Sequence, residues 1–391
     1  MSDNIDMKIS LTSILCLLAV SILHSGSPAQ AQGVGQDLPN VQEYQARLAQ
    51  YQAARNVYDV EATAYWDAIA AKRRGRNAKR RNHEAIGIED YVLSQPPIYT
   101  GPPRPIDPRA PAPPAPERPE IPVVADFLQN AVEQFDFVPQ RPPSDLDFKR
   151  AYAKVALAAG LTRDQIVGVY VFETGGNGTY DSQAGLVPYR PGARAISPAI
   201  GYNQLLSTNS VSLLAEHGAR IVAVLRQKAN SLSGDPKLVL ERKINALRRM
   251  IAFSRSVPDR WSEHDRLAKT TAGGFGIHAA VLDIDIGPLL QVQKLTDSVR
   301  FARSKGFSTP LTAAELEIMN LTGDGNGFDI VSMPQALRGR VPTANFFQQQ
   351  GYERNPVARR TGVVANLIAD IENKMQRGTQ AQGARELAAA F

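Results

Sequence analysis

The sequence predicts a mainly α-helical protein in which a helical arm and a proline-rich linker precede a helical domain. Beyond Asp145, apolar residues recur at the three- and four-residue spacing of amphipathic helices, and few stretches alternate as half-buried strands do. Twelve prolines between Pro96 and Pro122 preclude a packed core there and favour an extended spacer. We therefore place the linker at 96–144, the main domain at 145–376, which is long enough to bury its own core, and a flexible tail at 377–391.

The first 31 residues are organised like a secretory signal peptide. Lys8 precedes an apolar run from Ile9 to Leu23, and Ala29-Gln30-Ala31 offers a small-residue cleavage site. The run is shorter than the about 20 residues of a membrane-spanning helix. We expect cleavage near Ala31 and export of the mature chain to the periplasm. Because Cys16 is the only cysteine, the mature chain has neither a disulfide nor a thiol nucleophile.

Residues 32–95 form the expected arm. Between residues 41 and 71, tyrosine, leucine and alanine recur at spacings typical of a helical hairpin or a short coiled coil. The arm continues into a basic run that contains Lys72, Arg73, Arg74, Arg76, Lys79, Arg80 and Arg81. This run either binds an anionic envelope surface, at about 1 kcal/mol per basic residue near the lipid, or is a solvated basic helix. No base-reading module accompanies it, so nucleic acid is not an expected partner.

Helical patterns fill most of the region 145–376. Several of them begin with capping residues, such as Thr312 ahead of Glu315. We expect helices at 148–159, 162–174, 211–232, 236–254, 278–306, 312–321 and 358–376.

The helix 162–174 presents one carboxylate, Glu173, in a setting suited to acid catalysis. Thr162 and Gln165 have the form of a capping box, and the run from Ile166 to Phe172 is apolar around most of the helix, which predicts burial. Gly175-Gly176 closes the helix and leaves Glu173 at the negative end of its dipole. Burial and dipole both favour the protonated form that a general acid needs. The alternative is a solvated, inert glutamate at a frayed helix end.

A second segment, Ser197-Pro198-Ala199-Ile200-Gly201-Tyr202-Asn203-Gln204, bears on this choice. Together with Glu173 it resembles the signature of the soluble lytic transglycosylases, a branch of the lysozyme-like superfamily, in which a glutamate is followed by spaced serine, alanine, glycine and glutamine. The resemblance extends from Asp145 to about Met375 and implies a lysozyme-like fold. It implies that Glu173 is the acid/base of glycan cleavage and that the sugar cleft is lined by Ser197, Gly201, Tyr202 and Gln204.

The chain departs from this pattern at three points. Thr174 replaces the serine that usually follows the glutamate, and the long segment between Glu173 and Ser197 is rich in glycine and proline, as in a flap over a cleft. The family's Tyr-Asn-x-Gly element has a loose counterpart in Met319-Asn320-Leu321-Thr322-Gly323. The resemblance implies that Asn320 also binds the substrate.

The activity that the resemblance implies is non-hydrolytic cleavage of the MurNAc-GlcNAc β-1,4 bond of peptidoglycan, with 1,6-anhydroMurNAc ends and no cofactor or metal. Hydrolysis needs a second carboxylate, at about 5 Å for a retaining and 6.5–9.5 Å for an inverting enzyme, and Asp181 is the one nearby in sequence. Peptidoglycan glycan strands are the expected partner. A hydrolytic muramidase and a non-catalytic peptidoglycan-binding envelope scaffold are the alternatives.

Two further motifs suggest metal sites but do not match them. The segment from Asp324 to Asp329 begins like a calcium loop, yet it lacks the glycine at position six and the glutamate at position twelve. His278, Asp283 and Asp285 match no common zinc spacing. We expect these three side chains to cap or satisfy buried backbone.

Overall fold

The computed structural model describes residues 38–110, 120–186 and 193–391, so the predicted signal peptide lies outside the described residues. Within these ranges the chain is mainly helical and has three isolated β-bridges but no strand, which confirms the predicted α class. The chain divides into two compact units, Met1–Arg55 with Gly101–Pro113, and Asn56–Thr100 with Pro114–Phe391. The candidate site lies entirely in the second unit.

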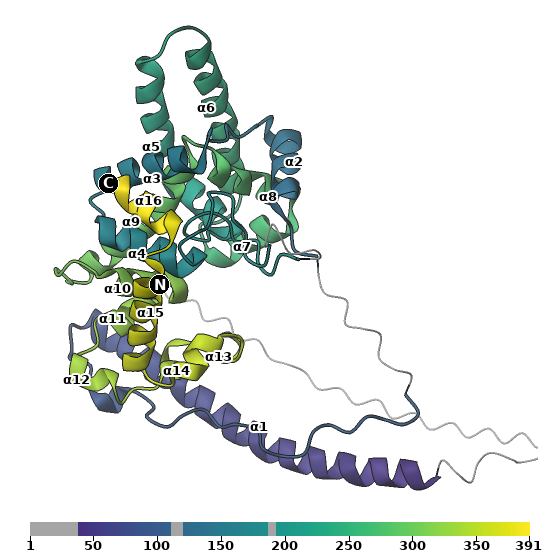
Figure 1. Ribbon diagram of the computed structural model, residues 1–391. Coiled ribbons are helices and arrows are strands. Elements are labelled where there is room, and N and C mark those ends of the chain that lie inside the picture. The colour runs from purple at the N-terminus through teal and green to yellow at the C-terminus, as the bar shows by residue number, and fades with distance from the viewer. Residues whose placement is uncertain (1–37, 111–119, 187–192) are drawn as a thin grey trace, which may run out of the picture. The chain divides into compact units, whose positions relative to one another are not determined.

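The predicted arm is a single helix, α1 (Leu38–Arg81), rather than a hairpin (Figure 1). Its first part belongs to the first unit, where Arg47 pairs with Glu43 one turn away. Its last part belongs to the second unit, where Tyr65 donates a hydrogen bond to the Ser94 carbonyl and Trp66 packs against Tyr352.

Most of the basic run is used to anchor α1 within the second unit. Arg76 is 1% exposed, donates from Nε to Asp329 at 2.8 Å and lies over the Tyr91 ring at 4.5 Å. Arg80 also pairs with Asp329, and Arg73 donates a hydrogen bond to the Phe347 carbonyl at 2.8 Å. These three charges have partners inside the second unit, so the basic run is not solvated along its whole length.

The other basic residues of the run are either paired or exposed. Lys79 pairs with Asp90 at 2.7 Å, and Lys72 donates to the Glu89 carbonyl. The side chains of Lys72, Arg74 and Arg81 are exposed. Binding of the basic run to an anionic surface stays a prediction.

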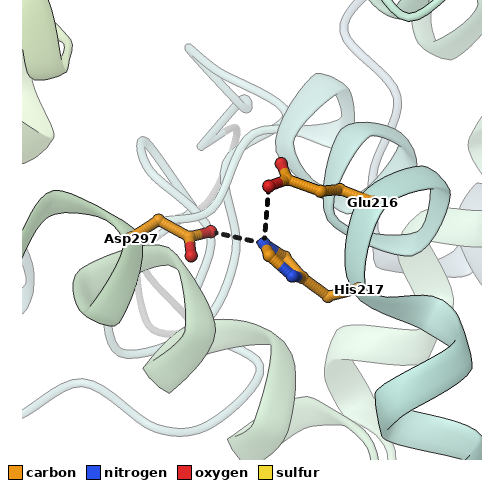
Figure 2. A group of neighbouring side chains, drawn as sticks. All are labelled: Glu216, His217 and Asp297. Carbon is orange, nitrogen blue, oxygen red and sulfur yellow. Dashed lines mark hydrogen bonds and ion pairs between the residues drawn. The ribbon is translucent and has the colours of Figure 1, made fainter. Parts of the chain in front are cut away.

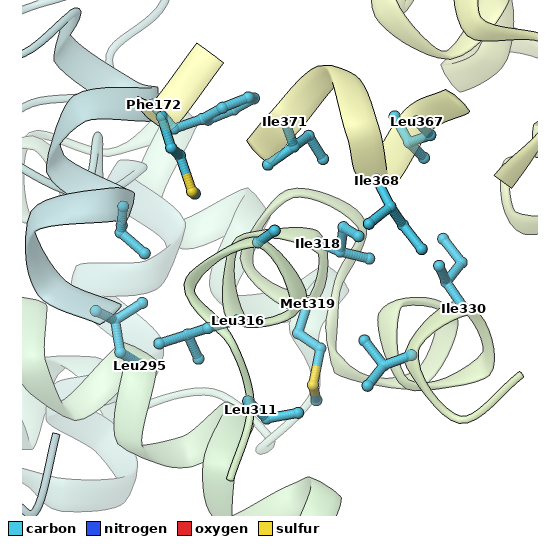
Figure 3. Packing of buried hydrophobic residues seen from close by; sticks show 14 of the residues in the cluster. Phe172, Leu295, Leu311, Leu316, Ile318, Met319, Ile330, Leu367, Ile368 and Ile371 are labelled. Carbon is cyan, nitrogen blue, oxygen red and sulfur yellow. The ribbon is translucent and has the colours of Figure 1, made fainter. Parts of the chain in front are cut away.

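The second unit has two hydrophobic clusters. The first cluster is built around α3 (Asp145–Ala158), α4 (Arg163–Thr174), α9 (Gly287–Ser304), α10 (Ala313–Thr322) and α15 (Val364–Gly378). Figure 3 shows Phe172, Leu295, Leu316, Ile318 and Ile371 directed into it from four of these helices. It therefore fixes α4 against α10, the two helices on which the candidate site is built.

The second cluster packs α2 (Val124–Phe135) against a pair of long antiparallel helices and two short ones. The long helices α5 (Ser207–Asn230) and α6 (Gly234–Ser254) stand side by side in Figure 1. The short ones are α7 (Trp261–Thr270) and α8 (Ala272–His278). Since Phe127 and Phe135 of α2 are buried here, the part of the predicted linker around α2 is corrected to domain core.

The predicted flexible tail 377–391 contains α16 (Gln382–Ala389), which packs on α3 and α4. Ala384 and Leu387 are fully buried, and Lys149 of α3 pairs with Glu386 at 2.7 Å. The prediction of a flexible tail is corrected, since its two apolar positions lie one turn apart and face the core.

Two of the predicted helices are interrupted. The stretch 278–306 breaks at Asp283, whose side chain accepts from the backbone nitrogens of Asp285 and Ile286, before α9 begins. The stretch 358–376 breaks at Gly362, whose φ of 72° separates α14 (Pro356–Thr361) from α15. The remaining short helices are η1 (Ile88–Asp90), η2 (Ala279–Leu282), α11 (Asp324–Val331), α12 (Gln335–Arg338), η3 (Thr343–Phe346) and α13 (Gln349–Arg354).

Within the described ranges, no single helix has both the length and the apolar character needed to cross a membrane. One pair, Ala272–Leu282 with Gly287–Ser304, meets these two criteria together across a bend of 97°. Its apolar residues contribute to the two clusters described above: Val281 and Leu290 are 0% exposed.

Candidate active site

The position of Glu173 is fixed by the two ends of α4. Thr162 Oγ1 accepts from the Gln165 nitrogen at 3.2 Å, and Gln165 Oε1 accepts from the Thr162 nitrogen at 2.9 Å, so the predicted capping box is confirmed. Gly175, with a φ of 68°, closes the helix in the left-handed region. Glu173 therefore lies in the last turn of a helix that is buried over most of its length.

A pocket of about 310 Å³ opens beside this turn. It brings together Glu173, Ser197, Gln204 and Asn320, which the sequence predicted as site residues. The other lining residues are Ala184, Ala199, Asn203, Leu205, Leu206, Asn209, Lys294 and Leu321. Glu173 is the only carboxylate among the described residues that line this pocket.

The Glu173 carboxyl is held by Asn320, which comes from α10. Asn320 Nδ2 donates to Glu173 Oε1 at 3.1 Å. Burial raises the pKa of Glu173 to about 7, against the lowering effects of hydrogen bonding with Glu317, of the Lys374 charge and of Asn320. Near neutral pH a large fraction of Glu173 is thus protonated and able to act as an acid.

Glu317 is a part of the site that sequence reasoning missed. It lies on α10 one turn before Asn320, is 0% exposed, and neither of its oxygens has a hydrogen-bond donor of ordinary geometry in the described chain. Burial and the neighbouring Glu173 raise its pKa well above the ordinary value. A signal was present in the sequence: a glutamate between Leu316 and Ile318, three residues from Asn320, falls on the buried face of an apolar helix.

Lys374 of α15 supplies positive charge near the two carboxyls. Its side chain is exposed, and Nζ lies 3.9 Å from the centre of the Phe172 ring. Its charge lowers the pKa values of both Glu173 and Glu317, but less than burial raises them.

Gln204 combines backbone strain with an unused hydrogen-bonding atom. Its φ is 42°, in the left-handed region that disfavours a side chain, and Nε2 donates to the carbonyls of Ser182 and Gly201 at 3.0 and 2.8 Å. Its Oε1 is buried without a hydrogen-bond donor in the described chain. Strain of this kind often accompanies a functional role.

Ser197 enters the pocket from the loop that precedes Gln204. The side chain is half-buried, and its hydroxyl accepts from the Ala199 nitrogen at 3.1 Å. The hydroxyl proton is not used in this bond, so it is available to a ligand.

Two predicted cleft residues lie outside the pocket lining. Tyr202 is 0% exposed, donates to Asp145 Oδ1 at 2.8 Å and packs edge-on against Tyr170, so the structure places it in the core and not at the sugar cleft. Gly201 has a φ of 84°, and a Cβ there would lie 2.9 Å from Gln291 Oε1. Its role in the structure is thus to allow this turn to pack on α9.

Asp181 is the residue that the sequence suggested as a second catalytic carboxylate, but it interacts with residues outside the pocket. It pairs with Arg141 and accepts from Thr179 Oγ1 at 2.8 Å. It is not among the residues that line the pocket.

A larger cavity, of about 860 Å³, lies between α1, the segment 95–99 and the helices α13 and α14. It has an aromatic lining that includes Trp66 and Tyr352, and its carboxylate, Glu353, is exposed. We place the candidate active site in the smaller pocket, since only there does burial keep a lining carboxyl protonated.

One side-chain group could approach a metal ion. Glu216, His217 and Asp297 have ligand atoms within 4.8 Å of one another (Figure 2). His217 Nε2 is already bonded to Asp297 at 2.9 Å, and Asp297 also accepts from Gln293 at 2.6 Å and lies 3.6 Å from Arg300. These donors satisfy the carboxylate, and the group is explained as a surface ion-pair network.

The two motifs that suggested metals have structural roles. Asp329 of the calcium-like segment forms an ion pair with Arg76. Asp283 caps backbone as described above and pairs with Lys243 at 3.0 Å, while His278 is bonded between the Ser210 hydroxyl and the Pro198 carbonyl.

No protein-family model, no curated protein and no solved structure matches this chain. Its function has to be inferred from its own residues.

Proposed function

We propose that this protein is an exported lytic transglycosylase that cleaves peptidoglycan glycan strands, with Glu173 as the acid/base. The observation that carries the proposal is a carboxyl with a pKa raised by burial to about 7, at the edge of a pocket that also offers Ser197, Gln204 and Asn320. Hydroxyl and amide groups of this kind match the hydroxyl and N-acetyl groups of a glycan strand.

The chemistry needs one group that first gives and then takes a proton. Protonated Glu173 donates to the glycosidic oxygen, the bond from this oxygen to the muramyl C1 breaks, and the GlcNAc 4-hydroxyl leaves. The Glu173 carboxylate then takes the proton of the muramyl C6 hydroxyl as O6 bonds to C1. The 1,6-anhydro ring is formed, and Glu173 is protonated again without any consumption of water.

The composition of the pocket favours this route over hydrolysis. A hydrolase needs a second carboxylate that reaches the substrate or a water beside it. Among the described residues the pocket has only Glu173 as a carboxylate, since Asp181 is paired with Arg141 and Glu317 is 0% exposed and does not line the pocket.

The test is incubation of purified mature protein with isolated sacculi, followed by chromatography and mass spectrometry of the released muropeptides. Wild type should release anhydro products, and Glu173→Gln should lose them by at least about 100-fold, as expected for removal of a general acid. Asp181→Asn is the matched control and should retain activity.

Other outcomes point to the alternatives. Hydrated, reducing ends would show a muramidase. Glycan binding without release by wild type, and unaffected by Glu173→Gln, would show a binding scaffold and contradict the proposed activity.

A further inference from the structure

Glu317 is an uncommon residue for the interior of a helical core. It is flanked by the buried residues Leu316 and Ile318 and is itself 0% exposed. Neither oxygen has a donor of ordinary geometry among the described residues. An ionised carboxylate in such a position is strongly disfavoured, so its presence requires an explanation.

The polar groups that interact with Glu317 come from four helices. They are Glu173 of α4, Asn320 of α10 itself, Lys374 of α15 and, more remotely, the Tyr152 hydroxyl of α3. The Asn320 amide bonds with ordinary geometry to Glu173, and the Tyr152 hydroxyl donates to Asn203 at 2.6 Å. Lys374 lies over the Phe172 ring. Asn320 and Lys374 favour the ionised form of Glu317, but burial and the neighbouring Glu173 oppose it more strongly.

Protonation of Glu317 removes the cost of burying an ionised carboxylate. An ionised carboxylate only accepts hydrogen bonds, whereas a protonated carboxyl has a hydrogen to donate. For Glu317 the neighbouring acceptor is the Glu173 carboxyl, because Glu317 lies one helical turn before Asn320, which bonds to Glu173, and because the two carboxyls affect each other's pKa. Glu317 is enclosed and Glu173 borders the pocket, so Glu317 is the carboxyl that keeps its proton when Glu173 gives up its own.

We propose that Glu317 is a positioning residue that stays protonated and donates a hydrogen bond to the Glu173 carboxyl. The inference rests on the proposed function, because Glu173 is the group that reacts. Glu317 fixes the orientation of Glu173 and stabilises the negative charge that Glu173 carries between giving up and regaining its proton. Such a bond strengthens as the charge develops, which is the condition for accelerating a reaction.

The activity test compares two substitutions at Glu317. Glu317→Gln keeps the shape and a donor, and should cleave within about threefold of wild type. Glu317→Leu removes the donor and should lower kcat by about 100-fold with little change in KM, as for loss of one charge-stabilising donor. It should also move the alkaline limb of the pH profile upward, because the Glu173 anion loses a stabilising bond. Glu372→Gln, at an exposed site on α15, is the control.

A second readout needs neither substrate nor activity. Infrared spectra of the folded protein should show a protonated-carboxyl band in wild type at a pH well above the pKa of about 7 of Glu173, where both Glu173 and the exposed carboxylates are ionised. Glu317→Gln should lose this band and Glu372→Gln should keep it. Thermal denaturation shows whether each variant is folded, and Glu317→Leu should be at least as stable as wild type, because an apolar side chain replaces a buried polar one.

The outcomes separate the two proposals. A wild-type band that Glu317→Gln removes, without any glycan cleavage by wild type, would leave the protonated pair intact and overturn the role in cleavage. Cleavage by wild type with no such band, or a Glu317→Leu variant with wild-type kcat and pH profile, would overturn the role of Glu317 and leave the proposed function in place.

Discussion

At the residue scale, the site depends on opposing influences on one carboxyl. Burial raises the pKa of Glu173, and the hydrogen bonds and Lys374 charge around it lower the pKa, with burial the larger effect. A general acid must be protonated, so kcat/KM should fall as pH rises through about 7.

Asn320→Ala tests the hydrogen-bonding part of this balance. Loss of the bond to Glu173 Oε1 destabilises the anion, and bonds to charged groups are worth about 1.5–3 kcal/mol, which corresponds to an upward shift of the alkaline limb by about one unit or more. The measurement is the pH dependence of kcat/KM on sacculi. Asn245→Ala, exposed on α6, should leave the profile where it is. An unmoved profile for Asn320→Ala would mean that this bond does not tune the acid.

At the element scale, a buried ion pair inside the second unit joins the last part of α1 to α11. Arg76 and Asp329 are 1% and 3% exposed. Removal of one partner from a buried pair leaves the other charge uncompensated, which costs about 3–5 kcal/mol. The nearby Arg80 also pairs with Asp329 and should reduce this cost.

Arg76→Ala should therefore lower the free energy of unfolding by about 3 kcal/mol, measured by denaturant titration. Arg74→Ala, an exposed position of the same basic run, is the control and should stay within about 0.5 kcal/mol of wild type. Equal effects of the two substitutions would show that the ion pair contributes no more than a surface charge.

At the scale of the whole molecule, the C-terminal segment closes the core that carries the site. Ala384 and Leu387 of α16 pack onto the α3 and α4 side of this core, and the Gly383 nitrogen donates to Asn177 Oδ1 at 3.1 Å, just beyond Glu173. The segment thus supports the end of α4.

Deletion of residues 379–391 should lower both the melting temperature and the cleavage rate. The deletion exposes apolar surface of α3 and α4, and each fully buried aliphatic side chain contributes about 1.5–3 kcal/mol. Calorimetry and sacculus digestion check the two effects. An unchanged melting temperature would mean that this segment does not stabilise the fold and behaves as the flexible tail that the sequence predicted.

Local signals in the sequence were sufficient for much of this architecture. The capping residues Thr162 and Thr312 and the closing Gly175 act on neighbours within four positions, so the ends of α4 and the start of α10 were predictable. Glu173, Ser197, Gln204 and Asn320 were predicted from short motifs, and the structure brings them to one pocket.

Contacts between distant segments could not be predicted from such local signals. The pairing of Arg76 with Asp329 joins residues 253 positions apart, and only the folded chain shows that the basic run is mostly internal. Proline content set the predicted linker boundary, whereas burial of Phe127 decides where the domain begins. Tyr202 was assigned to the cleft by its place in a motif, but its burial depends on Phe148, Tyr152 and Tyr170.

Gln204 gives this site a trade-off between heat tolerance and ligand affinity. Its left-handed backbone would be relaxed by glycine, and its Oε1 is buried without a donor, so the folded protein gains nothing from that atom. A library screened only for thermal survival would accept replacement of Gln204 where the relief of backbone strain outweighs the loss of the two hydrogen bonds from Nε2. The same library screened for glycan capture would retain Gln204. The difference in stability between the variants selected by the two screens would measure the stability cost of keeping Gln204 in the pocket.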